Sequence, residues 1–401
     1  MILAGGQGER LWPLTKDRAK PAVPFGGRYR IIDFVLSNFL NSRILNIKIL
    51  TQFKSDSLNR HLARGWQIAP QHGFYIDPVP AQMRTGRKWY MGTADAIYQN
   101  LNLVYDENPE FVCVFGGDHI YRMDVRQMLY YHIEKDAELT IAAIPKPLDI
   151  ARSYGVIEID ENWRITGFQE KPENPTPIPG KPDLALVSMG NYIFKRESLI
   201  DWVKEDAAME TDHDFGKNII TGKYRTGHVY AYDFSRNKVP GQKEEEKVYW
   251  RDVGSIDEYF NASMDLVEVA PVIDLYNRQW PLRTFSHFNP PAKFVFADEE
   301  TQRLGIATDS LVSEGCVISG GKLHRCILSP NVRINSYCDV EESILMEGVN
   351  IGRHCKIKKA IIDKYVDVPP KTEIGYDLEK DRKRFTVTDS GIVVIYKKEI
   401  L

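Results

Sequence analysis

The chain opens with the stretch Met1–Lys20, which reads Met-Ile-Leu-Ala-Gly-Gly-Gln-Gly-Glu-Arg-Leu-Trp-Pro-Leu-Thr-Lys-Asp-Arg-Ala-Lys. Its first apolar residues indicate the end of a strand, and the glycine-rich turn Gly5–Gly8 follows at once. Glycines let backbone N–H groups approach an anion closely, because no Cβ stands in the way. Four cations come next, which are Arg10, Lys16, Arg18 and Lys20. The stretch therefore predicts a phosphate-binding site at the end of the first strand.

Two better-known phosphate motifs are absent from this stretch. No Lys-Ser or Lys-Thr follows the glycines, so the turn is not a Walker loop. It also lacks the Gly-x-Gly-x-x-Gly pattern, with an acidic residue about 20 positions on, that marks dinucleotide-binding folds. An ordinary strand-to-helix turn with a solvated basic face stays open as the alternative interpretation.

Length and composition indicate a globular protein of two domains. The 401 residues exceed what one core usually organises, and the hydrophobic (43%) and charged (27%) fractions are those of globular chains. A net charge of -3 argues against a nucleic-acid partner, because such partners are usually bound by basic domains. The sequence contains no apolar run of membrane-spanning length and no signal segment, so we expect no membrane partner and a cytoplasmic location.

The five cysteines do not suggest a disulfide framework. None forms a Cys-x-x-Cys pair, their number is odd, and four of them lie among Val and Ile in the C-terminal third. We predict reduced, buried thiols that pack as small hydrophobic groups, with a zinc site as the alternative.

The first 265 residues alternate buried strands with amphipathic helices. The apolar residues within 32–40 share one helical face, residues 47–51 indicate a strand, and Ser55 is a candidate N-cap for the next helix. The continuous apolar run 111–115 is typical of a strand covered on both faces, and it ends at Gly116-Gly117-Asp118. This alternation predicts a parallel sheet layered by helices, with ligands bound beyond the carboxyl ends of the strands.

The remaining segments divide the chain further. Residues 154–169 predict a hairpin, followed by a proline-rich loop over 172–182. The pattern breaks between the predicted N-terminal domain, 1–265, and a second domain, 292–401, so residues 266–291 are interpreted as the linker. In the second domain, aliphatic residues recur six positions apart, which is the signature of a β-helix solenoid. An ordinary small β domain is the alternative.

Two aspartates are the strongest candidates for chemistry. Asp118 follows two glycines at the end of a buried strand, and Asp252 lies two positions before Gly254. Mg²⁺ prefers one or two carboxylates together with phosphate oxygens, so we expect this pair to hold Mg²⁺ over the phosphate loop. Lys171, beside the proline-rich loop, suits a sugar phosphate as a point charge. The segment His213–Lys217 contains Asp-Phe-Gly without the other kinase motifs and is interpreted as a structural turn.

The set of motifs in the sequence favours a reaction that needs no protein nucleophile. The sequence has no Gly-x-Ser-x-Gly elbow and no His-Glu-x-x-His motif. Attack of one phosphate on another requires positioning and charge neutralisation, which the glycine turn, the cations and Mg²⁺ would supply.

At this point the sequence resembles a known family, the ADP-glucose pyrophosphorylases (glucose-1-phosphate adenylyltransferases) of the bacterial glycogen pathway. The resemblance covers nearly the whole chain. Its first motif, Leu3-Ala-Gly-Gly-x-Gly-x-Arg-Leu11, is shared by sugar-1-phosphate nucleotidyltransferases in general. The narrower motifs are Arg18–Val23, Phe25–Gly27, Tyr29–Asp33, Leu36–Asn38, Trp89–Tyr90, Gly92–Ala96, Gly117–Tyr121, Glu170–Pro172, Ser188–Gly190, His213–Lys217 and Trp250–Gly254.

The resemblance implies a fold, a reaction and an assembly. The fold would be an α/β Rossmann-like nucleotidyltransferase domain followed by a left-handed parallel β-helix, usually in a homotetramer under allosteric effectors. The reaction would join ATP and glucose 1-phosphate into ADP-glucose with release of pyrophosphate. By similarity, the metal ligands would be Asp118 and Asp252, and the catalytic residues would be Arg10, Lys20 and Asp118. The nucleotide would be bound by Leu3, Ala4, Gly5, Gly6 and Gln52, and the sugar phosphate by Tyr90, Gly155, Glu170, Lys171 and Ser188. The regulatory residues would be Arg18, Arg30, Gln52 and Trp89.

Other functions stay open beside this one. A sister enzyme would use another nucleotide or sugar phosphate, and a catalytically silent regulatory subunit would share the fold. An oxidoreductase on a dinucleotide fold is the most distant alternative.

One departure from the family pattern concerns regulation. Asp17 stands where many members carry an activator-binding lysine, so we expect a weak or altered response to fructose 1,6-bisphosphate.

Overall fold

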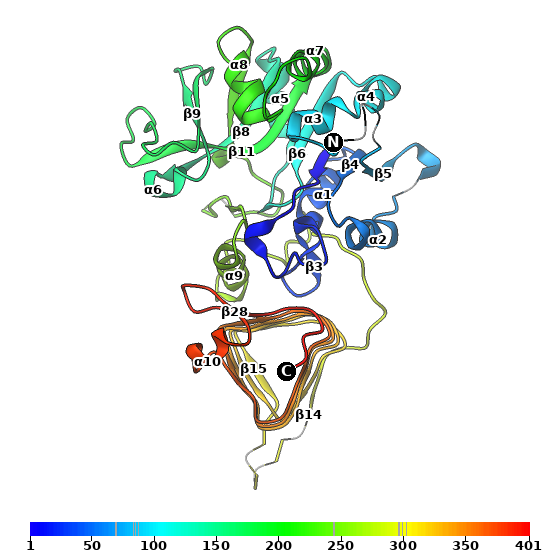
Figure 1. The fold of residues 1–401 in the computed structure, drawn as a ribbon, viewed down its shortest axis with the longest axis vertical. Coiled ribbons are helices and arrows are strands. Elements are labelled where there is room, and N and C mark those ends of the chain that lie inside the picture. The colour runs from blue at the N-terminus through cyan, green and yellow to red at the C-terminus, as the bar shows by residue number, and fades with distance from the viewer. Residues whose placement is uncertain are drawn as a thin grey trace.

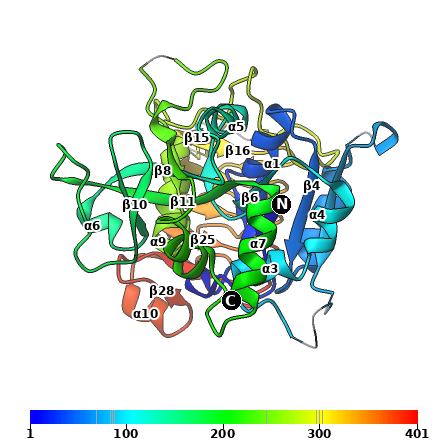
Figure 2. The ribbon, with the colours of Figure 1, turned by 90° about the horizontal axis from the view of Figure 1, so that it is seen from above.

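The computed structural model describes residues 1–401 except 69, 83, 85, 87, 244, 296, 299 and 302, and except the side chain of Pro70. Figure 1 shows an N-terminal α/β domain above a triangular β-helix, and Figure 2 shows the same chain from above. Among the described residues, no helix is both long and apolar enough to cross a membrane.

A nine-stranded sheet forms the centre of the N-terminal domain. Its main path runs β10-β9-β11-β6-β1-β4-β5, and β8 pairs with both β11 and β12. The strands are β1 (Ile2–Ala4), β4 (Asn46–Thr51), β5 (Tyr75–Pro80), β6 (Phe111–Gly116), β8 (Leu139–Pro147), β9 (Gly155–Ile159), β10 (Ile165–Glu170), β11 (Leu184–Lys195) and β12 (Val229–Asp233). The predicted hairpin over 154–169 is confirmed as β9 and β10, which pair antiparallel.

The prediction of a parallel sheet is wrong for part of this sheet. Strands β6, β1, β4 and β5 run parallel, as expected. However, β11 runs antiparallel to both β6 and β8. The reason is that the β9–β10 hairpin turns the chain back, so that the long β11 returns along β8 without a crossover helix.

Helices cover both faces of the sheet. On one face lie α1 (Ile31–Asn41), α2 (Asp56–Gly65) and α5 (Val125–Glu134), which share a core with Ile2 and Phe115. On the other lie α3 (Thr93–Tyr98), α4 (Leu101–Glu107) and α7 (Arg196–Ala207). Figure 2 shows α1 and α5 on one side of β11, β6 and β4, with α3 and α7 on the other. Ser55 directly precedes α2 as predicted, but its side chain makes no capping hydrogen bond.

Shorter elements complete the chain up to residue 267. The helices are η1 (Glu9–Leu11), η2 (Lys20–Ala22), η3 (Pro70–His72), α6 (Leu148–Ala151), the π-helix η4 (Phe215–Ile220), α8 (Thr221–Lys223), η5 (Phe234–Arg236), α9 (Ile256–Met264) and η6 (Asp265–Val267). Two small antiparallel pairs join β2 (Pro24–Phe25) to β3 (Tyr29–Arg30), and β7 (Ile120–Tyr121) to β13 (Trp250–Arg251). Residues 268–292 contain neither helix nor strand.

The second domain is the β-helix that the six-residue period predicts. Three sheets form its sides, and all their strands are parallel except β28. The strands are β14 (Lys293–Val295), β15 (Ile306–Thr308), β16 (Leu311–Val312), β17 (Val317–Ser319), β18 (Lys322–His324), β19 (Ile327–Leu328), β20 (Arg333–Ile334), β21 (Asp339–Glu341), β22 (Ile344–Leu345), β23 (Asn350–Ile351), β24 (Lys356–Lys358), β25 (Ala360–Ile362), β26 (Asp367–Val368), β27 (Glu373–Ile374), β28 (Thr386–Val387) and β29 (Val393–Ile395), with helix α10 (Leu378–Arg382) before the last two.

Aliphatic ladders hold the β-helix together. Buried residues line the inside of each coil on all three sides, and equivalent residues stack in register on the next coil. One ladder is Ile318, Ile334, Ile351 and Val368. The five cysteines form no disulfide, and the four in this domain are buried, so the prediction of reduced, packed thiols is confirmed.

One outer side of the β-helix packs against the N-terminal domain. Ile327, Ile344 and Ile361 point outward from the third sheet and join a buried cluster with Phe34 and Tyr259. The two domains therefore share one continuous apolar interface.

Candidate active site

The glycine turn lies directly over Lys20. Gly8 has a φ of +65°, which favours glycine, and a Cβ there would lie 3.0 Å from the Lys20 Cβ. The Thr15 hydroxyl donates to the Gly8 carbonyl at 2.9 Å. This hydrogen bond ties the glycine turn to the segment that leads to Lys20. Gly6 is exposed and has no atom within 4 Å of a Cβ position. The turn is thus anchored at Gly8 and open at Gly6, as an anion cradle needs to be.

Strand pairing brings the two aspartates together. Asp118 follows β6, Asp252 follows β13, and β13 pairs with β7 just beyond Asp118. The Lys20 ammonium bridges them, at 2.9 Å from Asp118 Oδ2 and 2.8 Å from Asp252 Oδ1. The predicted acid pair and one predicted cation therefore meet in a single cluster.

The charges of this cluster stabilise one another. Burial by itself lowers the pKa of the Lys20 ammonium, but the two carboxylates raise that pKa above its ordinary value. Burial by itself raises the pKa of the Asp118 carboxyl, but the positive charges beside it, Lys20 foremost, hold this pKa at about 2. Asp118 is therefore ionised at neutral pH and fit to bind a cation.

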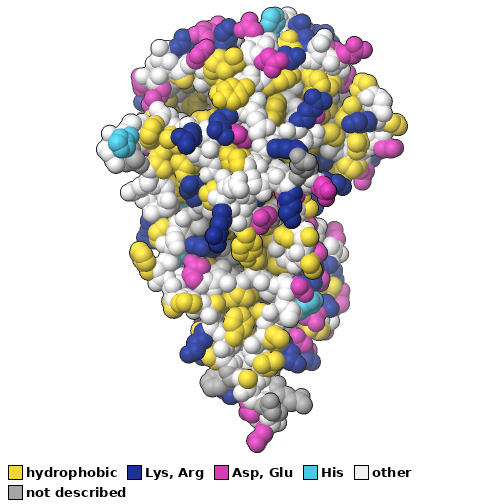
Figure 3. Space-filling model, turned by 180° about the vertical axis from the view of Figure 1, so that it is seen from behind, with side chains coloured by type: hydrophobic (Ala, Val, Ile, Leu, Met, Phe, Trp, Pro, Cys, Tyr) yellow, Lys and Arg dark blue, Asp and Glu magenta, His cyan; other side chains and the backbone are white. Residues whose placement is uncertain are grey.

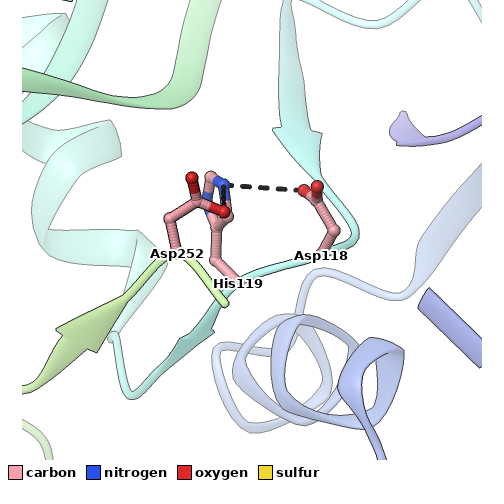
Figure 4. A group of neighbouring side chains, drawn as sticks. All are labelled: Asp118, His119 and Asp252. Carbon is pink, nitrogen blue, oxygen red and sulfur yellow. Dashed lines mark ion pairs between the residues drawn. The ribbon is translucent and has the colours of Figure 1, made fainter. Parts of the chain in front are cut away.

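Sequence reasoning missed His119, which lies beside both aspartates. Its Nε2 atom is 3.5 Å from Asp118 Oδ1 and 3.7 Å from Asp252 Oδ1 (Figure 4). Ligand atoms of these three residues all lie within 4.8 Å of one another. The only signal in the sequence was the position of His119 directly after Asp118. The two carboxylates fit a hard divalent cation, which prefers oxygen ligands.

Arg10 reaches the cluster from the other side of the turn. Arg10 is an exposed residue of helix η1, and its Nη2 atom lies 2.9 Å from the position that a Cβ on Gly254 would take. The same Cβ position lies 3.2 Å from Asp252 Oδ2, so the guanidinium and this carboxylate both border the backbone at Gly254. Arg10 and Lys20 thus flank the glycine turn with two cations.

Four residues predicted for the sugar phosphate gather at the end of the β9–β10 hairpin. A Cβ on Gly155 would come within 3.2 Å of Glu170 Oε2, so the carboxylate lies over bare backbone. Burial raises the pKa of Glu170 above its ordinary value. Lys171 Nζ lies 3.7 Å from Glu170 Oε1, and 63% of its side chain is exposed. Ser188, on β11, accepts a hydrogen bond from the Gly190 N–H at 3.2 Å.

Gln52, predicted for the nucleotide, is hydrogen-bonded to Tyr90, predicted for the sugar phosphate. The Tyr90 N–H donates to Gln52 Oε1 at 2.7 Å, and Asn100 Nδ2 donates to the Tyr90 hydroxyl at 2.9 Å. A Cβ on Gly5 would lie 3.2 Å from the Gln52 Cβ, so Gln52 stands beside the glycine turn. Leu3 and Ala4 form the end of β1 just before this turn. Trp89 is 59% exposed.

The segment 213–217 has a structural role as predicted, but it forms the N-cap and first residues of the π-helix η4 and not a turn. Asp214 Oδ1 accepts from the N–H groups of Gly216 and Lys217, which caps the π-helix η4. Its other carboxylate oxygen accepts from the Thr93 hydroxyl at 3.0 Å. Gly216 also approaches Glu170 Oε2, so this segment borders the sugar-side residues.

The predicted regulatory arginines lie away from the aspartates, toward the β-helix. Arg18 is buried and forms a bidentate pair with Asp363, with N–O distances of 2.9 to 3.0 Å. Arg30 donates to the Ser57 carbonyl and hydroxyl, each at 2.9 Å. Burial lowers the pKa of Arg30 to about 10. Arg30 and Lys364 line the same cavity between the domains.

Fold and site together define a nucleotidyl transferase. A family model described as nucleotidyl transferase matches residues 1–269, and one described as a GlmU-like, C-terminal hexapeptide matches residues 290–395. A glucose-1-phosphate adenylyltransferase of Anaeromyxobacter sp. (strain Fw109-5) is 59% identical over 99% of this chain and 97% of its own length. The enzymes of that name from Thermus thermophilus and Aliivibrio fischeri are 56% and 52% identical, over 99% and 100% of this chain and 97% and 98% of their own lengths. The chain belongs to the glucose-1-phosphate adenylyltransferase family.

Proposed function

We propose that this protein transfers the adenylyl group of ATP to α-D-glucose 1-phosphate, giving ADP-glucose and pyrophosphate and committing glucose to glycogen synthesis. The observation that carries the proposal is the bridge from Lys20 to Asp118 and Asp252 beneath the glycine turn. This bridge supports the proposal, because it gathers a cation and two carboxylates of the kind that a triphosphate and its metal ion require. The nearly full-length relatives of that name support this choice of substrates.

In this reaction the protein positions two phosphates and provides no covalent nucleophile. A phosphate oxygen of glucose 1-phosphate bonds to the α-phosphorus of ATP. The bond from that phosphorus to the oxygen bridging to the β-phosphate breaks in line, and pyrophosphate leaves. Arg10 and Lys20 would neutralise the triphosphate, and Lys171 would bind the sugar phosphate. Asp118 and Asp252 would hold Mg²⁺, which supplies charge neutralisation on the phosphates when bound.

The remaining site residues would determine which substrates fit. Leu3, Ala4, Gly5 and Gly6 present backbone to the nucleotide, and Gln52 fixes the Tyr90 backbone beside them. Glu170 and Ser188, next to the bare backbone of Gly155, offer hydrogen bonds to sugar hydroxyls.

The test is pyrophosphate release by the purified chain with Mg²⁺ and glucose 1-phosphate, with ATP, dTTP and GTP compared. We expect turnover with ATP and formation of ADP-glucose. Preference for dTTP or GTP would instead identify a sister enzyme. No turnover alone, restored by a partner chain, would identify a regulatory subunit.

We infer that anionic effectors bind in the cavity between the domains. Its basic lining residues are Arg28, Arg30, His61, His287 and Lys364, and its acidic ones are Glu314 and Glu347. Glu347 is paired with Lys364 at 2.7 Å, and Glu314 lies 3.8 Å from Arg28. This excess of basic groups suits a phosphorylated metabolite. Because Asp17 replaces a lysine, activation by fructose 1,6-bisphosphate should be weak, and strong activation would overturn this expectation. Activation ratios for a set of sugar phosphates, in the wild type and in Arg30→Ala, test the assignment.

A homotetramer in the cytoplasm is part of the same proposal. Apolar side chains are exposed on the β-helix as well as on the other domain (Figure 3), including Phe294 at 46% and Ile306 at 37%. Such side chains suit a subunit interface. The unpaired buried thiols suit a reducing compartment. Light scattering after size-exclusion chromatography should give about four times the 46.0 kDa chain mass.

A further inference from the structure

His119 lies where a third ligand of the metal site would lie. Its Nε2 atom faces Asp118 Oδ1 at 3.5 Å and Asp252 Oδ1 at 3.7 Å. Figure 4 shows the imidazole beside the Asp252 carboxylate and facing the carboxylate of Asp118. Two ligands at about 2.1 Å from one cation are roughly 3 to 4 Å apart. The observed separations fall within that range.

Lys20 does not exclude a cation from this position. Its ammonium contacts Asp118 through Oδ2, whereas the imidazole faces Oδ1 of the same carboxylate. A cation held between Asp118 Oδ1, Asp252 and His119 would therefore leave the Lys20 contact with Asp118 in place. It would replace the ammonium at Asp252 Oδ1, which Lys20 contacts at 2.8 Å and which also faces the imidazole.

Packing holds the imidazole in this orientation. Only 14% of the side chain is exposed, and its ring meets Trp250 edge-on, with centroids 5.5 Å apart. Its Cε1 atom lies against two glycines, 3.6 Å from a Cβ position on Gly116 and 3.8 Å from one on Gly190. The Nδ1 atom is buried and has no hydrogen-bond partner in the described part of the chain. Packing against Trp250 and the two glycines thus orients the ring, and Nε2 is the ring nitrogen that faces the two carboxylates.

We propose that His119 Nε2 is a third protein ligand of the divalent cation, and that it makes the site bind Mn²⁺ and Co²⁺ more tightly than Mg²⁺. The inference rests on the proposed function, which places a cation on Asp118 and Asp252. An imidazole nitrogen favours transition-metal ions, whereas Mg²⁺ takes oxygen ligands almost exclusively. A site with two carboxylates and one imidazole therefore differs in metal preference from one with carboxylates alone.

The test uses the full chain without nucleotide and Mn²⁺ as the probe. Electron paramagnetic resonance gives the free Mn²⁺ concentration and hence Kd, and its pulsed form detects coupling to a ligating ¹⁴N nucleus. We expect such coupling in the wild type and its loss in His119→Phe, which keeps the ring contact with Trp250. The Mn²⁺ Kd of that variant should rise about 10- to 100-fold. The Mg²⁺ affinity, measured by competition, should change much less.

Two further variants make the result specific. His119→Asn offers an amide oxygen, so it should lose the ¹⁴N coupling but bind Mg²⁺ at least as well as the wild type. His324→Phe, on the β-helix with a side chain 52% exposed, should leave both signals unchanged. Unchanged Mn²⁺ affinity in both His119 variants, or a wild type without ¹⁴N coupling, would overturn the inference.

Adenylyl transfer is assayed separately, so that the two proposals fail independently. Turnover of ATP without ¹⁴N coupling would overturn the role of His119 alone. Coupling without turnover of any nucleotide would leave His119 as a metal ligand and overturn the proposed reaction alone.

Discussion

Lys20 shows how one side chain organises a site of opposite charges. Two carboxylates as close as Asp118 and Asp252 repel each other, and the ammonium between them removes that repulsion in the absence of a metal. The buried ammonium is in turn stable only because it is paired. Each of the three residues therefore depends on the other two, and losing one affects the whole cluster.

Asp118→Asn should lower kcat by at least about three orders of magnitude, because a charged metal ligand is lost where phosphoryl charge develops. Steady-state kinetics with ATP and glucose 1-phosphate measure the effect. Asp136→Asn, at a side chain 86% exposed, is the matched control and should be neutral. Near-normal turnover of Asp118→Asn would refute the role of Asp118.

Lys171→Ala should act mainly on the sugar phosphate. We expect the KM for glucose 1-phosphate to rise at least about tenfold, which is the loss of one charge-assisted contact, while the KM for ATP stays near normal. Lys181→Ala, at an exposed position near the far end of the proline-rich loop, is the control. An unchanged KM for glucose 1-phosphate would remove Lys171 from that pocket.

At the scale of elements, the β-helix uses the same backbone conformation at corresponding corners of successive coils. The left-handed conformation recurs in register on successive coils, for example at Tyr337, His354 and Lys371, whose φ values lie between +61° and +65°. Side chains other than glycine pay a conformational cost in the left-handed region. The stacking of the sides of the β-helix on successive coils offsets this cost at each corner. The sides, not the corners, carry the stability of this domain.

Ile357→Ala should therefore lower the free energy of unfolding by about 2–5 kcal/mol, because this side chain is fully buried in one ladder. Lys356→Ala, its neighbour on the outer face with a side chain 57% exposed, should change stability by no more than about 0.5 kcal/mol. Urea unfolding followed by circular dichroism compares the pair. Equal losses would contradict a core made of these ladders.

Helix α5 contains a buried titratable group. His132 is fully buried, its Nδ1 atom lies 2.8 Å from the Thr140 hydroxyl, and burial lowers its pKa to about 4. The unfolded chain binds this proton near pH 6.5, so the stabilisation is complete above that pH and is lost as the pH falls toward 4. The loss amounts to about 3 kcal/mol.

His132→Leu should remove this part of the pH dependence. Unfolding free energies measured between pH 7 and pH 4 should fall less steeply in the variant than in the wild type. His228→Leu, at an exposed position, should keep the wild-type slope. Parallel curves for the wild type and His132→Leu would show that His132 is protonated in the folded protein.

At the scale of the whole molecule, residues of the β-helix contact Lys16 and Arg18, which lie shortly before Lys20 of the candidate active site. Asp363 holds Arg18, and Tyr396 lies under the Lys16 ammonium at 3.6 Å from the ring centroid. Lys20 follows two residues after Arg18. The position of the Lys20 ammonium thus depends on a contact between domains that no local pattern specifies.

Arg18→Met should destabilise the chain by about 3–5 kcal/mol, because it leaves the Asp363 carboxylate buried and unpaired. The double variant Arg18→Met, Asp363→Asn should recover most of this loss, since no buried charge remains. Chemical unfolding of the wild type, both single variants and the double variant gives the coupling. Additive losses would contradict the buried pair.

Much of this protein follows from its sequence alone. The buried run 111–115, the hairpin over 154–169 and the six-residue period each depend on neighbouring residues, so local patterns predicted β6, β9–β10 and the β-helix. The glycine turn and the two aspartates were identifiable because the turn is followed by several cations and because both acids stand beside glycines. Sequence motifs likewise indicated the family.

Tertiary structure decided the rest. The antiparallel β11, the bridge from Lys20 to two aspartates and the Arg18–Asp363 pair all join residues far apart in the chain. His119 escaped notice because a histidine after an aspartate has no meaning until the β7–β13 pairing brings Asp252 to it. The physical reason is that electrostatic and coordination geometry depend on distances in space. A sequence pattern reports only separations along the chain.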